Sequence, residues 1–145
     1  MIAIDTNILV HSHRAESPWH ERAVEALRSA SAGAWAIPWP CVHEFLAIVT
    51  HPRIFDPPTP VEDALGTVRG WLGSPTLTLL CEAEGYFDLL AETVERAGID
   101  GPRVHDARIA ALCMQAGVRE LLTADRDFSR FEKLRTRNPL APSGP

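Results

Sequence analysis

Four acidic side chains in this 145-residue chain stand where apolar residues would be expected. Asp5 ends the apolar segment of "MIAIDTNILV", and Asp125 ends a second one, "LLTAD". Glu44 and Asp106 interrupt two apolar helical patterns. Carboxylates that converge repel one another and resist burial, and a hard divalent cation with oxygen ligands offsets both costs. The pattern therefore predicts a Mg²⁺ or Mn²⁺ centre with one or two ions.

The elements that must position these acids are short apolar strands that alternate with helices. The pattern predicts strands over residues 2–4, 34–37, 76–81 and 120–124, with a fifth near 133–137. This alternation is typical of an α/β domain in which helices cover both faces of a central, mainly parallel sheet of four to five short strands. We expect one domain over residues 1–140 and a flexible tail over 141–145.

Two local signals predict where helices begin. Asn7 is expected to cap a helix that starts at Ile8. Thr59 and Glu62 have the spacing of a capping box around Pro60.

The edge of the predicted sheet is where the acids can meet. Ligands bind beyond the carboxyl ends of the strands in open parallel sheets, and Asp5 and Asp125 both follow strands. Helices that start after strands place their first turns at the same edge, which suits Glu44 and Asp106. Two ions about 4 Å apart would clamp the attacking and leaving oxygens of a phosphodiester. The predicted reaction is therefore metal-assisted hydrolysis of a phosphodiester bond.

Each acid also has a simpler explanation. Asp5 could cap the following helix, and Glu44 could be an exposed helical residue. Asp106 could interact only with the dipole of its helix, and Asp125 could be a turn residue. Asp127 fits either a fifth ligand or a turn acid equally well.

Composition limits the class of protein. The net charge is −5 and no apolar run approaches the roughly 20 residues of a membrane span. The N-terminus carries no basic segment of the kind that opens a secretory leader, so we expect a cytoplasmic protein. Cys41, Cys81 and Cys113 are widely spaced and are expected to be reduced core thiols.

A nucleic-acid substrate requires positive charge near the acids. Two bound divalent ions would offset most of the net negative charge, and basic residues concentrate after residue 125. His105, Arg108 and Arg126 neighbour the predicted ligands and are candidate RNA contacts. The alternative is a solvated charged surface, and Arg108 could equally pair with a ligand acid.

Four motifs resemble one family. "AIDTNILV", "CVHEFLAIV", "HDARIAAL" and "LLTADRDF", in this order, are similar to those of the PIN-domain nucleases and above all of the VapC-type toxins. The resemblance covers about residues 1–140. It implies a three-layer α/β/α fold and a Mg²⁺- or Mn²⁺-dependent endoribonuclease that acts as the toxin of a type II toxin–antitoxin pair.

The resemblance also implies roles for individual residues. Catalysis and metal binding fall on Asp5, Glu44, Asp106 and Asp125, with Asp127 matching an acid that some members add. The small polar residues expected to orient carboxylates or water are Thr6, Asn7 and Thr123. The partners implied are RNA, a cognate antitoxin whose C-terminal segment enters the acidic site, and a second copy of the chain.

Other functions compete with this hypothesis. A PIN-domain nuclease that processes RNA outside a toxin system has the same acids, and so does a non-catalytic interaction module with a relict metal site. A phosphatase of the haloacid dehalogenase kind needs an aspartate where this chain has Asn7. A response-regulator receiver needs a lysine after a late strand, and the only lysine, Lys133, is poorly placed for that role.

Overall fold

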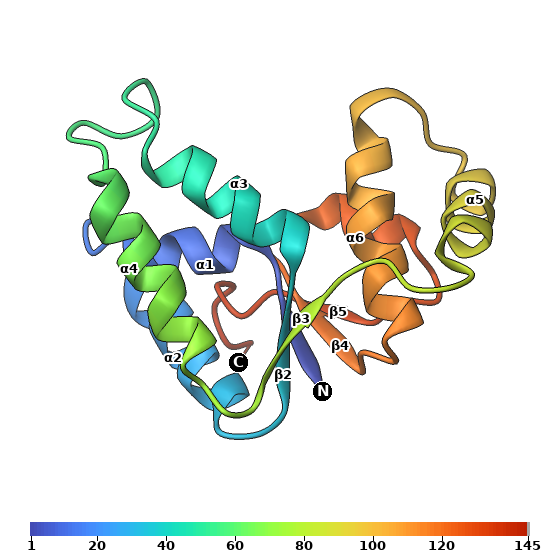
Figure 1. Cartoon of the computed structure of the whole chain (residues 1–145), viewed down its shortest axis with the longest axis horizontal. Coiled ribbons are helices and arrows are strands. Elements are labelled where there is room, and N and C mark those ends of the chain that lie inside the picture. The colour runs from blue at the N-terminus through green and yellow to red at the C-terminus, as the bar shows by residue number, and fades with distance from the viewer. Residues whose placement is uncertain (145) are drawn as a thin grey trace.

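A single parallel sheet organises the chain (Figure 1). The computed structural model describes residues 1–144. Its elements, in chain order, are β1 (Ile2–Ile4), α1 (Thr6–His13), α2 (His20–Ser31), β2 (Trp35–Pro38), α3 (Trp39–Val49), α4 (Val61–Leu72), β3 (Leu77–Leu80), α5 (Tyr86–Ala97), the 3₁₀ helix η1 (Gly101–Arg103), α6 (Val104–Gln115), β4 (Glu120–Leu122), the 3₁₀ helix η2 (Arg126–Arg130) and β5 (Thr136–Arg137).

The strand order in the sheet is β3-β2-β1-β4-β5, and every neighbouring pair is parallel. β1 therefore lies at the centre, with β2 on one side and β4 on the other. Ile4 pairs with Leu122, so the residues that follow these two strands leave the sheet side by side. The predicted mainly parallel sheet of short strands is confirmed.

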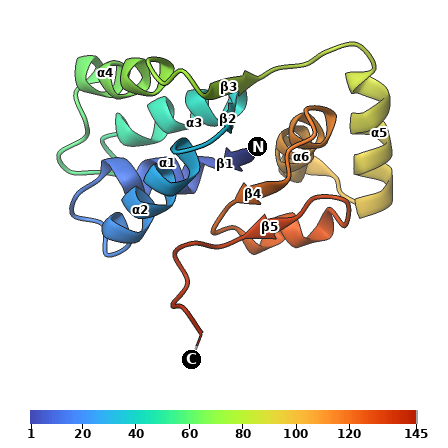
Figure 2. The same ribbon diagram turned by 90° about the horizontal axis from the view of Figure 1, so that it is seen from below.

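Helices cover both faces of the sheet. α1 to α4 lie on one side and α5 and α6 on the other, as the view from below shows (Figure 2). All four residues of β2 are buried, which is expected where helices pack on both faces. The three-layer α/β/α architecture is confirmed. Over residues 1–144 no helix is both long and apolar enough to cross a bilayer.

α1 begins two residues earlier than the sequence predicts. Asp5, and not Asn7, is its N-cap, because the Asp5 carboxylate accepts a hydrogen bond from the Thr6 amide at 2.8 Å. The Asn7 side chain is engaged elsewhere, since its Oδ1 accepts from the backbone amide of Ala124 at 3.0 Å. The predicted cap was wrong because Asn7 has a partner on a distant strand end.

The predicted capping box before α4 was also wrong. Pro60 is the N-cap residue, and no side chain caps that helix. The Thr59 hydroxyl instead lies 3.0 Å from His13 Nε2 and accepts from Arg14 Nη1 at 3.1 Å. It therefore ties the loop before α4 to the end of α1, a contact that local spacing could not predict.

The packing of α1, α3 and α4 predicts a large cost for truncating Phe45. Its ring is fully buried and meets the rings of His13 and Trp71 edge-on, at centroid distances of 5.3 and 4.7 Å. We expect Phe45→Ala to lower the free energy of unfolding by about 3–5 kcal/mol, measured by urea denaturation. Phe87→Ala is the matched control, because Phe87 is 74% exposed and its loss should cost within about 0.5 kcal/mol. Equal losses in the two variants would contradict this description of the core.

Candidate metal centre

The candidate centre lies where the chain changes direction across the sheet. After β3, at one edge, the chain crosses to β4 on the other side of β1, and ligand sites form at such switch points beyond the carboxyl ends of the strands. The Asp5 amide donates to the Leu122 carbonyl at 3.0 Å, which continues the β1–β4 pairing past the last strand residue. Asp5 and Thr123 are thereby held next to each other.

Three carboxylates converge at this edge. Oxygen atoms of Asp106, Asp125 and Asp127 all lie within 4.8 Å of one another. Asp106 comes from the first turn of α6, while Asp125 and Asp127 flank the start of η2. The Asp127 amide donates to the Asp125 carboxylate at 2.8 Å, so the turn itself brings these two acids together. Asp127, whose place was left open by the sequence, is part of the cluster.

Asp5 is the buried member of the site, with 4% of its surface exposed. Its Oδ1 accepts from the Thr6 amide at 2.8 Å and faces the Cys41 thiol at 3.6 Å. Its Oδ2 accepts from Thr123 Oγ1 at 2.7 Å and from Asn7 Nδ2 at 3.0 Å. Four donors from α1, α3 and the end of β4 therefore fix the orientation of this carboxylate.

Glu44 joins the centre through Thr6. The Thr6 hydroxyl donates to Glu44 Oε2 at 2.7 Å, and this bond connects the first turn of α1 to the middle of α3. Thr123 extends the same network on the other side, because its hydroxyl accepts from the Asp125 amide at 3.0 Å. The three polar residues singled out from the sequence, Thr6, Asn7 and Thr123, thus contact the acids directly.

The electrostatics of the site show uncompensated negative charge. Within residues 1–144, no lysine, arginine or histidine forms an ion pair with any of the five acids. Burial and the neighbouring carboxylates, first among them Asp125, raise the pKa of Asp106 to about 6. Burial also raises the pKa of Asp5, although hydrogen bonds from Thr123 and Thr6 oppose the shift. Oxygen donors that repel one another and lack a protein cation fit a hard divalent ion.

The candidate RNA contacts differ in their exposure and in whether they form an ion pair. His105 and Arg126 are exposed, and each neighbours an acid of the cluster in sequence. Arg108 instead forms an ion pair with Glu82 at 3.6 Å, beyond the end of β3. It is therefore not the partner of one of the five acids.

Cys41 is the contact that sequence reasoning missed. It was expected to be an ordinary core thiol, whereas its sulfur faces the Asp5 carboxylate. Its position three residues before Glu44, on the same helical face, was the available signal. Cys113 is buried as predicted, but Cys81 is exposed, which corrects the prediction for that residue.

The raised pKa of Asp106 predicts a pH-dependent stability in the absence of metal. Between about pH 4 and pH 6 the folded state binds a proton at Asp106 that the unfolded chain has released, so this group's contribution falls as pH rises through that range. We expect Asp106→Asn in EDTA to match the wild type near pH 4 and to exceed it above pH 6. The gain should be on the order of 1 kcal/mol, because the half-buried side chain is partly screened by water. Urea denaturation across this range measures it.

Glu95→Gln provides the control for this series. It removes one carboxylate from the exposed surface of α5, away from the cluster, and should keep the wild-type profile. If Asp106→Asn is no more stable than the wild type at pH 7, the carboxylates of the cluster do not repel one another.

The chain matches known proteins along nearly its whole length. The family model described as PIN domain matches residues 2–134. Among curated relatives, Ribonuclease VapC48 of Mycobacterium tuberculosis is 29% identical over 139 residues, covering 94% of this chain and 96% of that protein. Ribonuclease VapC43 of the same organism is 30% identical over 142 residues, covering 97% and 96%.

Solved structures agree on the fold. VapBC2 from Rickettsia felis, bound to a DNA fragment from its promoter, includes a chain that aligns with a TM-score of 0.69 at 18% identity, covering 95% of this chain and 98% of that one. VapC20 of Mycobacterium tuberculosis, described as a sarcin-ricin loop cleaving toxin, aligns with a TM-score of 0.67 at 16% identity, covering 89% and 93%. The fold, the acidic edge and the full-length match lead to one conclusion: this chain belongs to the PIN domain family and, within it, to the VapC ribonucleases.

Proposed function

We propose that this chain is a Mg²⁺- or Mn²⁺-dependent endoribonuclease that acts as the toxin of a type II toxin–antitoxin pair. The observation that carries the proposal is the convergence of Asp106, Asp125 and Asp127 within 4.8 Å, beside the buried Asp5 and with no protein cation to neutralise them among residues 1–144. Hard oxygen ligands of this kind suit divalent ions that also bind phosphate oxygens.

The contacts suggest a role for each residue of the site. Asp106, Asp125 and Asp127 hold the ion, with Asp5 and Glu44 completing the acidic wall. When bound, the ion supplies Lewis acidity toward a phosphate oxygen and the nucleophilic water. Thr123 and Thr6 keep the carboxylates oriented, so that the acids do not have to reorganise when substrate arrives.

Substrate binding is the proposed task of the exposed groups around the acids. Arg126 follows Asp125 directly, and His105 precedes Asp106, so both can reach a phosphodiester held over the cluster. Arg108 is committed to Glu82 at 3.6 Å, and both side chains are partly exposed, so this pair can open toward substrate at little cost.

The toxin role rests on the relatives. The curated relatives are named VapC ribonucleases, one structural neighbour from Klebsiella pneumoniae is described as a toxin–antitoxin complex, and VapC20 is described as a toxin. We therefore propose a cognate antitoxin as the protein partner, RNA as the substrate, a homodimer as the assembly and the cytoplasm as the place of action.

Cleavage of RNA by the purified, antitoxin-free protein tests the nuclease. We expect discrete fragments of total cellular RNA with Mg²⁺ or Mn²⁺ and none with EDTA. Attack by water in line with the leaving oxygen gives 5′-phosphate and 3′-hydroxyl ends, which end-group analysis detects. A 2′,3′-cyclic phosphate would instead mean attack by the RNA's own 2′-hydroxyl and would exclude hydrolysis by water.

Asp5→Asn and Asp106→Asn are the matched variants for this assay. Each removes one charge from the site while keeping the shape of the side chain. Both should fold, and the rate of cleavage should fall about 100-fold or more. Each variant removes a charge at the place where charge develops in the transition state. A variant that cleaves at the wild-type rate would remove that residue from the site.

Expression in a bacterial host tests the toxin role separately. The wild-type chain should arrest growth, and co-expression of the small protein encoded beside it should restore growth. Asp106→Asn should be harmless while still binding that partner in pull-down. A chain that cleaves RNA in the test tube but never slows growth would favour an RNA-processing nuclease.

A further inference from the structure

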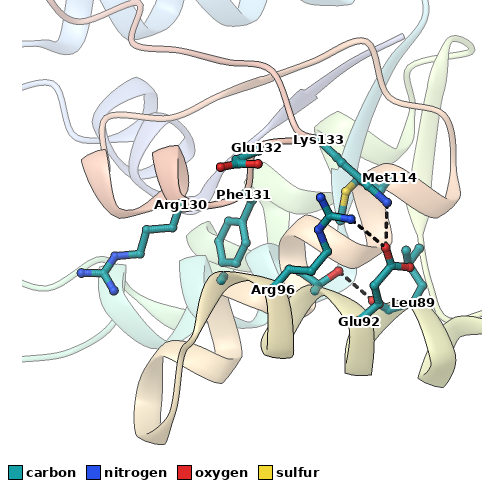
Figure 3. A pocket seen from close by; sticks show the side chains of 10 residues that line it. Leu89, Glu92, Arg96, Met114, Arg130, Phe131, Glu132 and Lys133 are labelled. Carbon is teal, nitrogen blue, oxygen red and sulfur yellow. Dashed lines mark hydrogen bonds and ion pairs between the residues drawn. The ribbon is translucent and has the colours of Figure 1, made fainter.

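A cavity beside α5 has none of the five acids in its lining (Figure 3). It has a volume of about 350 Å³ and is lined by α5, the C-terminal part of α6, the end of η2 and the segment that follows. This size is within the range of pockets that bind small organic groups.

The lining of the cavity includes three basic and two acidic side chains, a net charge of +1. Glu92 accepts from Lys133 Nζ at 2.7 Å and lies 3.6 Å from Arg96, so one carboxylate holds two cations in place. Arg130 lies at the other side of Phe131 and extends away from these two cations (Figure 3). Within residues 1–144 Arg130 forms no ion pair, and Glu132 is the only other acid that lines the cavity. Arg96 and Lys133 together carry one positive charge more than the Glu92 carboxylate that they share, which favours an anion beside them.

Apart from Thr93, the remaining lining is apolar. Leu89, Ala97, Met114 and Phe131 contribute to it. Phe131 is firmly positioned, because it is 5% exposed and its ring meets that of Phe128 edge-on at 5.8 Å. A ligand that fits must therefore combine an apolar or planar part with a negative charge.

η2 connects the cavity to the acidic cluster. Asp127 lies near the start of this helix and Arg130 at its end, and Phe131 follows directly. A 3₁₀ helix rises about 2 Å per residue, so the five residues of η2 span about 10 Å. A single strand of nucleic acid that crosses the cluster along η2 reaches the cavity within a short stretch of backbone.

We propose that this cavity is a subsite for one nucleotide of the RNA substrate, with the base against the apolar lining and the phosphate beside Arg96 and Lys133. The proposal rests on the ribonuclease function proposed above. A nucleotide supplies both the planar group and the negative charge, and single-stranded RNA is recognised in this way in general. An acidic peptide supplies the charge but no planar group for the apolar lining.

Binding of a short single-stranded RNA of mixed sequence, followed by fluorescence anisotropy in EDTA, tests the subsite without cleavage. The variant Arg96→Ala/Lys133→Ala should weaken binding about fivefold for each cation removed at about 0.1 M salt. The slope of log affinity against log salt should become shallower by about 1.4. Ala97→Trp fills the cavity without changing the charge and should also weaken binding.

Arg28→Ala is the matched control, because Arg28 forms an exposed ion pair with Glu25 on α2. It should bind RNA like the wild type. All variants should bind Mn²⁺ in calorimetry as the wild type does, since none of them alters the acidic cluster. Wild-type RNA affinity in both cavity variants, or an equal loss in Arg28→Ala, would overturn the subsite.

Two further outcomes separate the subsite from the proposed function. Loss of RNA binding in the cavity variants, with no RNA cleavage by the wild type in Mn²⁺, would support the subsite and reject the nuclease. A glutamate-rich peptide could instead bind the wild type and be released by the cavity variants, while RNA binding stays unchanged. That result would overturn the RNA assignment in favour of an acidic protein segment.

Discussion

The hydrogen bond from Thr123 to Asp5, 2.7 Å between buried atoms, joins the ends of the two central strands and anchors the candidate centre. A buried carboxylate without donors would cost several kcal/mol, roughly, and Asp5 avoids that cost with four donors. Those donors come from α1, α3 and the end of β4. The environment of Asp5 can therefore form only when α1 and α3 have packed on the sheet.

The three acids of the cluster lie in the opposite kind of environment. Asp106, Asp125 and Asp127 are half-buried or exposed, repel one another, and have no cation partner within residues 1–144. Repulsion at such a site lowers the stability of the metal-free protein, and a bound cation would recover it. The surrounding core offsets this cost with buried apolar contacts such as Phe45 between α1 and α4. Function and stability thus make opposing demands at the same sheet edge.

A chain with a net charge of −5 can still bind a polyanion when its charges are sorted in space. Five acids lie at the switch point, where a bound metal would reverse their effect on phosphate. Four basic residues lie along η2 and around the cavity, namely Arg126, Arg130, Lys133 and Arg96. One short helix would then link the place where RNA is proposed to be cut to the place where it is proposed to be held.

The sequence by itself determined the alternation of strands and helices, and it identified the acids that follow β1 and β4. Both are local properties, because apolar periodicity and strand ends are visible along the chain. Only the tertiary structure decided that Asp127 joins the cluster, that Cys41 faces Asp5, that Arg108 pairs with Glu82, and that Asp5 rather than Asn7 caps α1. These outcomes depend on distances between segments far apart in sequence. The order of the strands sets those distances by placing β4 beside β1.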